Sequence, residues 1–287
     1  MSVQEKDEYT HSAGGHEVTV GIFDSGIGGL GVLHEAVCAL PQARFLFYAD
    51  RAHVPYGERS EREILSYAEE ITAFLRERGC AAIVIACNTA TSVAAEALRE
   101  HYRGEGLPII GMEPAVKPAL EWEPEGPVLV IATPVTVREH KLQALLERLD
   151  ATHRVHVHPM PELVRFAEGE RFEDPAVEAY LAEELMPYVE AGIQSVVLGC
   201  THFNYFVPQL RALFGPGVRL FDGNDGTVRH LAALLGLQAE SEPDGRFRES
   251  AFDQTRITCF DSGVEITDPA ELAFFSRLHA RFAQTRQ

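Results

Sequence analysis

The sequence lacks several features that define whole classes of protein. None of its apolar runs approaches the length of a transmembrane helix, and residues 1–16 are polar, without the apolar segment of a signal peptide. Cysteine is scarce: the chain of 287 residues has five, and no Cys-x-x-Cys pair occurs. An odd, sparse set on a long chain argues against a disulfide framework. We therefore expect a cytoplasmic protein that does not bind membranes, with residues 1–16 as a mobile extension.

Positive charge is also in short supply. The chain carries 25 Lys and Arg residues against 43 Asp and Glu residues, a formal net charge of −18. Such an acidic surface repels phosphates and argues against a nucleic-acid partner, although a helix N-terminus can still bind a small anion. No metal-ligand spacing and no Gly-x-Ser-x-Gly motif is present. We therefore expect neither a metal site nor a serine hydrolase.

The chain does contain a strand–helix alternation that runs twice. Runs rich in β-branched residues predict strands at 18–23, 44–48, 81–86, 107–111, 128–132, 154–158, 195–198, 218–221 and 255–260. Helical periodicity predicts helices that end at 40 and 214, and helices at 61–78, 90–101, 137–149, 175–191, 226–237 and 269–284. A linker-like segment, WEPEGP, lies at 122–127. The rhythm predicts an α/β fold with two doubly wound parallel sheets.

Two segments, IVIACNTA and VVLGCTHF, resemble each other and contain Cys87 and Cys200. In each, a hydrophobic strand is followed by a small residue, the cysteine and a helix start. Ligand sites in such sheets lie beyond the carboxyl ends of the strands. A helix N-terminus there favours the thiolate, so we expect the thiol pKa to fall from about 8.5 toward neutrality. The alternative, that cysteine only packs as a small hydrophobe, we accept for Cys38, Cys80 and Cys259.

A matched pair of acid–base groups has a specific chemical use. Inverting a stereocentre next to a carboxylate requires that one face loses a proton and the other gains one. Two thiols on opposite sides of a substrate can do this without a cofactor, because each can act as base or acid near pH 7. The pair therefore predicts a cofactor-independent amino-acid racemase with Cys87 and Cys200 as its two bases.

The segment IFDSGIGGLG supports a competing interpretation. Gly26-x-Gly28-x-x-Gly31 follows a predicted strand and matches the dinucleotide-binding pattern, and Asp50 ends the next strand where a ribose-binding acid belongs. This predicts an NAD-dependent oxidoreductase. Against it, Asp24 and Ser25 occupy the strand tip. An anion there opposes a pyrophosphate, but it can accept hydrogen bonds from a substrate ammonium group.

Three further motifs lie at predicted strand ends, and each has a purely structural alternative. Pro55-Tyr56-Gly57 brings a phenol and backbone amides to this edge, or forms a surface turn. The hydroxyls of Thr133 and Thr136 can bind a carboxylate, or cap a helix. His202 can polarise the neighbouring thiol or hydrogen-bond a substrate carboxylate, or serve only the packing.

The motifs FDSGIGG, PYG, IACNTATS, GMEPAVKPA and LGCTH, in this order, resemble those of the glutamate racemases of the aspartate/glutamate racemase superfamily. The resemblance covers roughly residues 18–237. It implies two α/β domains related by pseudo-twofold symmetry, 17–112 plus 222–287 and 113–221, with the active site between them. It also implies a homodimer without a cofactor that converts glutamate and supplies D-glutamate for peptidoglycan.

The resemblance also assigns roles to residues. Cys87 would act on the D-enantiomer and Cys200 on the L-enantiomer, with Asp24, His202 and, in LVRFAEGE, Glu168 assisting the thiols. The residues expected to contact the substrate are Asp24, Ser25, Pro55, Tyr56, Gly57, Asn88, Thr89, Thr133, Thr136, Thr201 and His202.

The chain departs from the family pattern at three places. Asn204 stands where proline is usual, Arg51 where a small residue is commoner, and the tail 238–287 is longer than expected. Related alternatives are an aspartate or hydantoin racemase. A different alternative is a binding role, since some glutamate racemases are thought to bind DNA gyrase.

Overall fold

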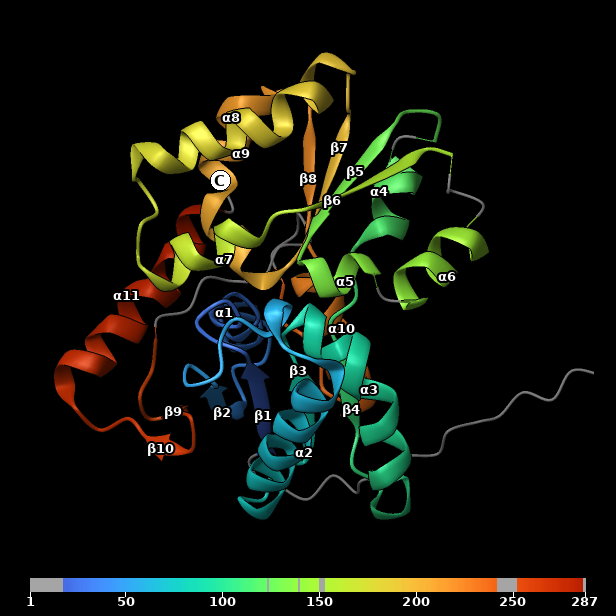
Figure 1. Cartoon of the computed structure of the whole chain (residues 1–287). Coiled ribbons are helices and arrows are strands. Elements are labelled where there is room, and N and C mark those ends of the chain that lie inside the picture. The colour runs from blue at the N-terminus through green and yellow to red at the C-terminus, as the bar shows by residue number, and fades with distance from the viewer. Residues whose placement is uncertain (1–17, 123, 139, 150–152, 242–251, 286–287) are drawn as a thin grey trace, which may run out of the picture.

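The computed structural model describes residues 18–122, 124–138, 140–149, 153–241 and 252–285. The extension predicted for residues 1–16 lies outside these ranges, as do residues 242–251 of the C-terminal tail. The described chain forms two sheets with helices packed on them, one in the lower and one in the upper half of Figure 1. The predicted α/β fold with two parallel-sheet units is confirmed.

The first sheet has the strand order β10-β9-β2-β1-β3-β4. All neighbouring strands are parallel except β9 and β10, which form an antiparallel hairpin at the outer edge. Its strands are β1 (Val18–Asp24), β2 (Ala43–Ala49), β3 (Ala82–Ile85), β4 (Ile109–Gly111), β9 (Ile257–Asp261) and β10 (Val264–Glu265).

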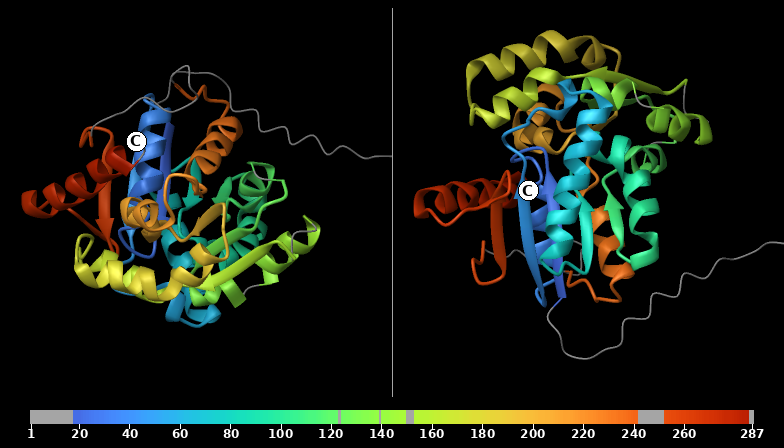
Figure 2. Two further views of the ribbon diagram at one scale, coloured as in Figure 1. Left: turned by 90° about the horizontal axis from the view of Figure 1, so that it is seen from above. Right: turned by 60° about the horizontal axis from the view of Figure 1, so that its bottom comes forward.

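Helices cover both faces of this sheet. On one face α1 packs against α10 and α11, and on the other α2 packs against α3. In the right view of Figure 2, β9 continues the sheet beyond β2, and α11 lies at that outer edge. The helices are α1 (Leu30–Ala39), α2 (Glu61–Glu77), α3 (Asn88–Tyr102), α10 (Asn224–Leu234) and α11 (Pro269–Thr285), with short 3-10 helices η1 (Tyr56–Glu58) and η2 (Arg103–Glu105).

The second sheet is fully parallel, in the order β6-β5-β7-β8. Its strands are β5 (Val128–Ala132), β6 (Val155–Pro159), β7 (Ser195–Gly199) and β8 (Arg219–Phe221). The helices of this half are α4 (Val116–Trp122), α5 (Pro134–Arg138), α6 (His140–Arg148), α7 (Pro161–Glu168), α8 (Pro175–Glu190) and α9 (Val207–Phe214), with the 3-10 helix η3 (Thr201–Phe206).

The central strands are buried along their whole length because helices cover both of their faces. Every residue of β3, β5 and β7 is buried, as is usual for strands in parallel sheets. The largest apolar cluster contains side chains of both sheets, among them Val20 and Phe45 of the first and Leu129 and Val196 of the second. The two halves therefore share a continuous core that holds their strand ends together.

The predicted elements need three corrections. The helix predicted at 137–149 is two helices, α5 and α6, and α5 begins earlier because the Thr136 amide donates to Thr133 Oγ1 at 3.4 Å. The short helices α4 and α7 were not predicted. The hairpin strand β10 was missed as well, because β10 spans only two residues. The domain limits at 112/113 and 221/222 stay a prediction.

Two further predictions concern the cysteines and membrane-spanning helices. All five cysteines are free and buried, so no disulfide framework exists. None of the helices in the described ranges is long and apolar enough to span a membrane.

A buried histidine on α11 makes stability depend on pH. The His279 side chain is 1% exposed and its ring packs edge-on against the ring of His34 on α1, with 4.6 Å between centroids. Burial lowers the pKa of His279 to about 4. An unfolded histidine has a pKa of about 6.5, so between these values the unfolded chain binds a proton that the folded chain does not.

We therefore predict that His279 makes the free energy of unfolding fall as pH drops from about 6.5 to about 4, by up to about 1.4 kcal/mol per pH unit. Urea unfolding of the wild type and of His279→Gln at pH 7, 6 and 5 measures this. The difference in the free energy of unfolding between the two proteins should change at each step in pH. A constant difference would contradict the prediction.

Candidate active site

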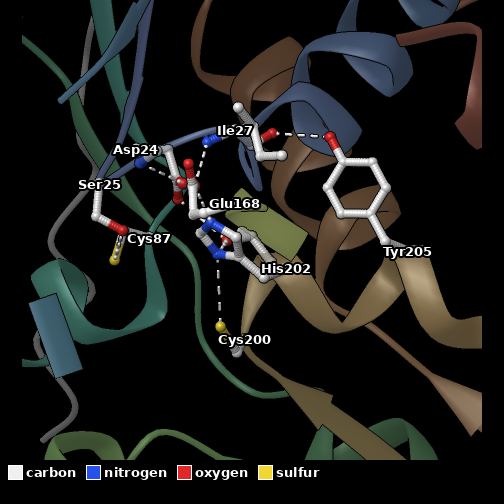
Figure 3. A network of polar contacts seen from close by, with 10 residues as sticks. Asp24, Ser25, Ile27, Cys87, Glu168, Cys200, His202 and Tyr205 are labelled. Atoms are coloured by element: carbon white, nitrogen blue, oxygen red, sulfur yellow. Dashed lines mark hydrogen bonds and ion pairs between the residues drawn. The ribbon is translucent and has the colours of Figure 1, made fainter. Parts of the chain in front are cut away.

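The site lies where strands of the two sheets end facing each other. Asp24 ends β1, Cys87 follows β3, and Cys200 follows β7, so three strand ends supply its centre (Figure 3). Cys87 is 5% and Cys200 6% exposed. Carboxyl ends of strands in open α/β sheets are where ligands bind. The predicted juxtaposition of the two cysteine segments is thus present.

Cys87 caps the N-terminus of α3. Its Sγ accepts a hydrogen bond from the Ala90 amide at 3.4 Å, and its thiol donates to Ser25 Oγ at 3.8 Å. The prediction of a lowered thiol pKa is wrong for Cys87. Burial, followed by the negative charge of Asp24, raises the pKa to about 12, and the amide of Ala90 offsets only part of this. Cys87 is therefore held as a protonated thiol.

Cys200 has a different neighbourhood, because η3 rather than an α-helix follows it. His202 Nδ1 lies 3.8 Å from Cys200 Sγ, and His202 Nε2 lies 2.6 Å from Glu168 Oε1. Burial opposes a charge on His202, but its hydrogen bonds with Cys200 and Glu168 raise the pKa well above the usual value. The result is a chain from a carboxylate through an imidazolium to a thiol (Figure 3).

Glu168 and Asp24 join the two halves of the molecule. Glu168 ends α7 in the second half, and its Oε1 accepts the Ile27 amide of the first half at 2.8 Å. Asp24, fully buried, accepts the Gly26 amide at 3.1 Å and the Thr201 hydroxyl at 3.1 Å. Burial raises the pKa of Asp24, so this carboxyl can take up and release a proton.

Three threonine hydroxyls meet on the Cys87 side. Thr89 Oγ1 lies 2.9 Å from Thr133 Oγ1 and 3.4 Å from Thr136 Oγ1, and the last two oxygens are 3.0 Å apart. Thr89 lies in the first turn of α3, whereas the other two lie at the start of α5 in the second half. Each hydroxyl can donate a hydrogen bond, so the cluster suits a carboxylate. Thr133 also accepts the Thr136 amide, so it caps α5 at the same time.

The remaining predicted residues lie around this centre with partners of their own. The Tyr56 hydroxyl donates to Asp50 Oδ2 at 2.6 Å, and Asn88 Nδ2 donates to the Met112 carbonyl at 3.3 Å. Burial raises the pKa of Tyr56, so its hydroxyl stays protonated. Pro55 follows a cis peptide bond and is half-buried, and it precedes η1.

Comparison with known proteins agrees with this geometry. Residues 31–231 match the family model described as Asp/Glu/Hydantoin racemase. The glutamate racemase of Campylobacter curvus is 46% identical over 91% of this chain and 96% of its own length, and that of Campylobacter concisus is 44% identical over 93% and 98%. The crystal structure of Escherichia coli glutamate racemase in complex with L-glutamate and the activator UDP-MurNAc-ala superimposes with a TM-score of 0.74, 31% identity and 92% and 96% coverage.

The chain belongs to the Asp/Glu/hydantoin racemase family. The resemblance drawn from the five sequence motifs is thereby confirmed. The protein is therefore a racemase, an isomerase that inverts a stereocentre of its substrate. The individual roles of the site residues stay predictions.

The glycine-rich loop of this racemase does not have the surroundings of a dinucleotide site. A Cβ at Gly26 would lie 1.9 Å from Glu168 Oε1, and one at Gly28 would lie 2.4 Å from Thr201 Oγ1 and 2.6 Å from His202 Nδ1. The glycines thus admit side chains of the other half, whereas in a dinucleotide site such glycines let the backbone approach a pyrophosphate. Asp50, the expected ribose ligand, binds Tyr56 instead. These contacts disfavour the oxidoreductase interpretation.

Two cavities flank the site. One of about 700 Å³ opens beside Glu168 and contains Arg51, and one of about 390 Å³ lies beside Asn88 and Thr136. Arg51, one of the departures from the family pattern, pairs there with Asp261 at 3.1 Å. Within the described ranges, no group of three or more His, Cys, Asp and Glu residues is arranged to hold a metal ion.

Sequence reasoning missed Ile27 and Tyr205 as members of the network. The Tyr205 hydroxyl donates to the Ile27 carbonyl at 3.0 Å, and the Ile27 amide donates to Glu168. Tyr205 lies three positions after His202 in CTHFNYF, so one turn of helix was a usable signal. In the same motif Asn204, which replaces the usual proline, donates to the Thr201 carbonyl at 3.2 Å and closes the first turn of η3.

The contact at Gly28 gives a direct test of this close approach. In Gly28→Ala the new methyl group would lie 2.8 Å from the His202 backbone nitrogen, so the loop and η3 must separate. We predict a loss of racemase activity of at least about 10-fold, with destabilisation of about 1–3 kcal/mol. Gly217→Ala is the matched control, because no heavy atom lies within 4 Å of its added Cβ. Equal activity of the two variants would contradict the prediction.

Proposed function

We propose that this racemase interconverts L- and D-glutamate with two thiols on opposite faces of the substrate. The observation that carries the proposal is the pair of buried thiols, one at a strand end of each sheet. Glutamate as the substrate is supported by curated glutamate racemases of 39–46% identity and by the Escherichia coli enzyme bound to L-glutamate.

In the L-to-D direction, Cys200 acts as the base. Its thiolate, beside the His202 imidazolium, takes the Cα proton, so an S–H bond forms while the Cα–H electron pair spreads onto the α-carboxylate. Cys87, held protonated by its raised pKa, then delivers its proton to the opposite face of Cα. The product is the D-enantiomer, and the negative charge has moved from Cys200 to Cys87.

In the D-to-L direction the roles reverse. Cys87 must lose its proton, and Asp24 is the group whose raised pKa suits it to accept one. Ser25 Oγ, 3.8 Å from Cys87 Sγ, can then hydrogen-bond the thiolate. Cys200 then donates its proton to the opposite face of Cα, and His202, supported by Glu168, lies beside the sulfur. Each of the two cysteines thus works as the acid in one direction and as the base in the other.

The surrounding polar groups suit the charges of glutamate. The threonine cluster of Thr89, Thr133 and Thr136 offers hydroxyls to a carboxylate, and Asp24 with Ser25 offers oxygens to the ammonium group. We assign further substrate contacts to Pro55, Tyr56, Gly57, Asn88, Thr201 and His202. Because both thiols are almost fully buried, glutamate reaches them only if the elements that cover the site move apart.

Three finer statements belong to the same proposal. We propose that the enzyme acts in the cytoplasm, works as a homodimer and supplies D-glutamate for peptidoglycan. Racemisation of aspartate or a hydantoin, and binding to DNA gyrase, stay alternatives that separate assays address.

The two-thiol reaction predicts a specific pattern of isotope incorporation. In D₂O the wild type should place deuterium at Cα of the product enantiomer before deuterium accumulates in the remaining substrate, because a different thiol serves each face. Circular dichroism follows the racemisation and mass spectrometry the label. Early, equal labelling of both enantiomers would show a single base and overturn the mechanism.

Single substitutions test the two thiols separately. Cys87→Ser and Cys200→Ser should each lose racemisation by about 100-fold or more, the contribution typical of a positioned acid or base. Cys80→Ala serves as the control, since Cys80 precedes β3 whereas Cys87 follows it, so the two cysteines lie at opposite ends of that strand. Activity that survives in both serine variants would refute the proposal.

The choice of substrate has its own experiment. Turnover without added cofactor should be fastest for the two glutamate enantiomers in a panel with aspartate, a hydantoin and neutral amino acids. Faster turnover of aspartate or a hydantoin would replace glutamate as the substrate and leave the two-thiol chemistry standing.

A further inference from the structure

The link between α7 and α8 lies against the C-terminal helix α11. In Figure 1 this link descends beside the upper part of α11. Glu170 pairs with Arg277 at 2.9 Å, and Glu173 pairs with Arg281. The Arg281 guanidinium also lies over the Phe172 ring, 4.4 Å from its centroid. One face of α11 therefore contacts three residues of the six that separate the two helices.

The apolar side of this contact leads back to the active site. The Phe172 ring, which is 4% exposed, lies 4.8 Å from the Tyr205 ring, and the Tyr205 ring lies 4.6 Å from that of Phe282 on α11. The hydroxyl of Tyr205 holds the Ile27 carbonyl, and the Ile27 amide holds Glu168. The helix, the link and the glycine-rich loop thus form one packed unit around the Glu168 carboxylate.

The backbone between Glu168 and this contact is short and constrained. Glu168 is the last residue of α7, and Glu170 follows two positions later with a φ of 53°. A residue other than glycine is disfavoured in this left-handed region, and such residues persist where surrounding contacts hold them. Here the Glu170 amide donates to the Ala167 carbonyl at 2.9 Å, and the Glu170 side chain pairs with Arg277. A shift of the link would carry Glu168 with it, away from His202.

We infer that α11 sets the position of Glu168 through this link, so that Arg277 and Arg281 are positioning residues for the proton transfer at Cys200. The inference rests on the proposed two-thiol reaction. The ion pairs are exposed and individually weak: the Arg277 side chain is 62% and the Glu173 side chain 71% exposed. Weak contacts suffice because they have only to select one position of a short link, not to fold the chain.

The inference predicts a directional change that a general structural defect would not cause. A misplaced Glu168 slows proton transfer at Cys200 and leaves the transfer at Cys87 unchanged. The primary isotope effect on kcat/KM should therefore rise for Cα-deuterated L-glutamate, whose deuteron goes to Cys200. It should fall for Cα-deuterated D-glutamate, whose deuteron goes to Cys87.

The experiment reverses both charges on α11. In Arg277→Glu/Arg281→Glu we expect kcat to fall by about 10-fold, within the range caused by a misplaced catalytic group, together with the opposite changes in the two isotope effects. Adding Glu170→Arg and Glu173→Arg should restore kcat to within about twofold of the wild type, because the pairs re-form with exchanged charges.

A matched control changes the same amount of charge elsewhere. Arg76→Glu/Arg103→Glu reverses two exposed arginines that pair with Glu105 and Glu100, and should leave kcat and both isotope effects unchanged. If the reversed α11 variant fails to fold, Arg277→Gln/Arg281→Gln removes the pairs without repulsion and should show the same directional change.

The outcomes separate this inference from the proposed function. A folded α11 variant with wild-type kcat and isotope effects would overturn the positioning role alone. A loss of activity without rescue by the charge exchange, or with both isotope effects moving together, would also overturn it. A wild type that does not racemise glutamate would overturn the proposed function before any variant is tested.

Discussion

The structure depends on how closely the glycine-rich loop after β1 approaches the second half of the molecule. Because Gly26 and Gly28 lack a Cβ, Glu168 comes within 2.8 Å of the Ile27 amide, and His202 lies directly over the loop. That approach brings the strand end with Cys200 opposite the strand end with Cys87. A side chain at Gly26 or Gly28 would push the halves apart and separate the two thiols.

The same close packing makes the two thiols unequal. Both follow buried strands in similar sequence contexts, yet burial and the Asp24 charge hold Cys87 protonated, whereas Cys200 faces an imidazolium that Glu168 supports. A racemase that works in both directions needs one acid and one base at the start of each turnover. In the structure Cys87 is the protonated member of the pair, and Cys200 is the member that lies beside the imidazolium.

The C-terminal tail is part of this arrangement. It adds β9 to the outer edge of the first sheet and returns as α11 to pack on α1 and against η3. Its aromatic contact runs from Phe282 through Tyr205 to the loop that holds Glu168. The part of the chain furthest along the sequence thus supports a carboxylate of the site, which explains why a long tail is compatible with the family chemistry.

The sequence alone determined the alternating fold and the two thiol positions, because hydrophobic runs and the motifs around Cys87 and Cys200 are local signals. The resemblance to the family also pointed to Glu168, although no local signal predicted the short helix α7 that carries it. Only the tertiary structure decided the pKa of Cys87, since burial and the charge of Asp24 outweigh the helix N-terminus that the sequence shows. The roles of Tyr205 and Arg281 were decided there too, because their partners lie far away in the chain and become neighbours only when both sheets have packed together.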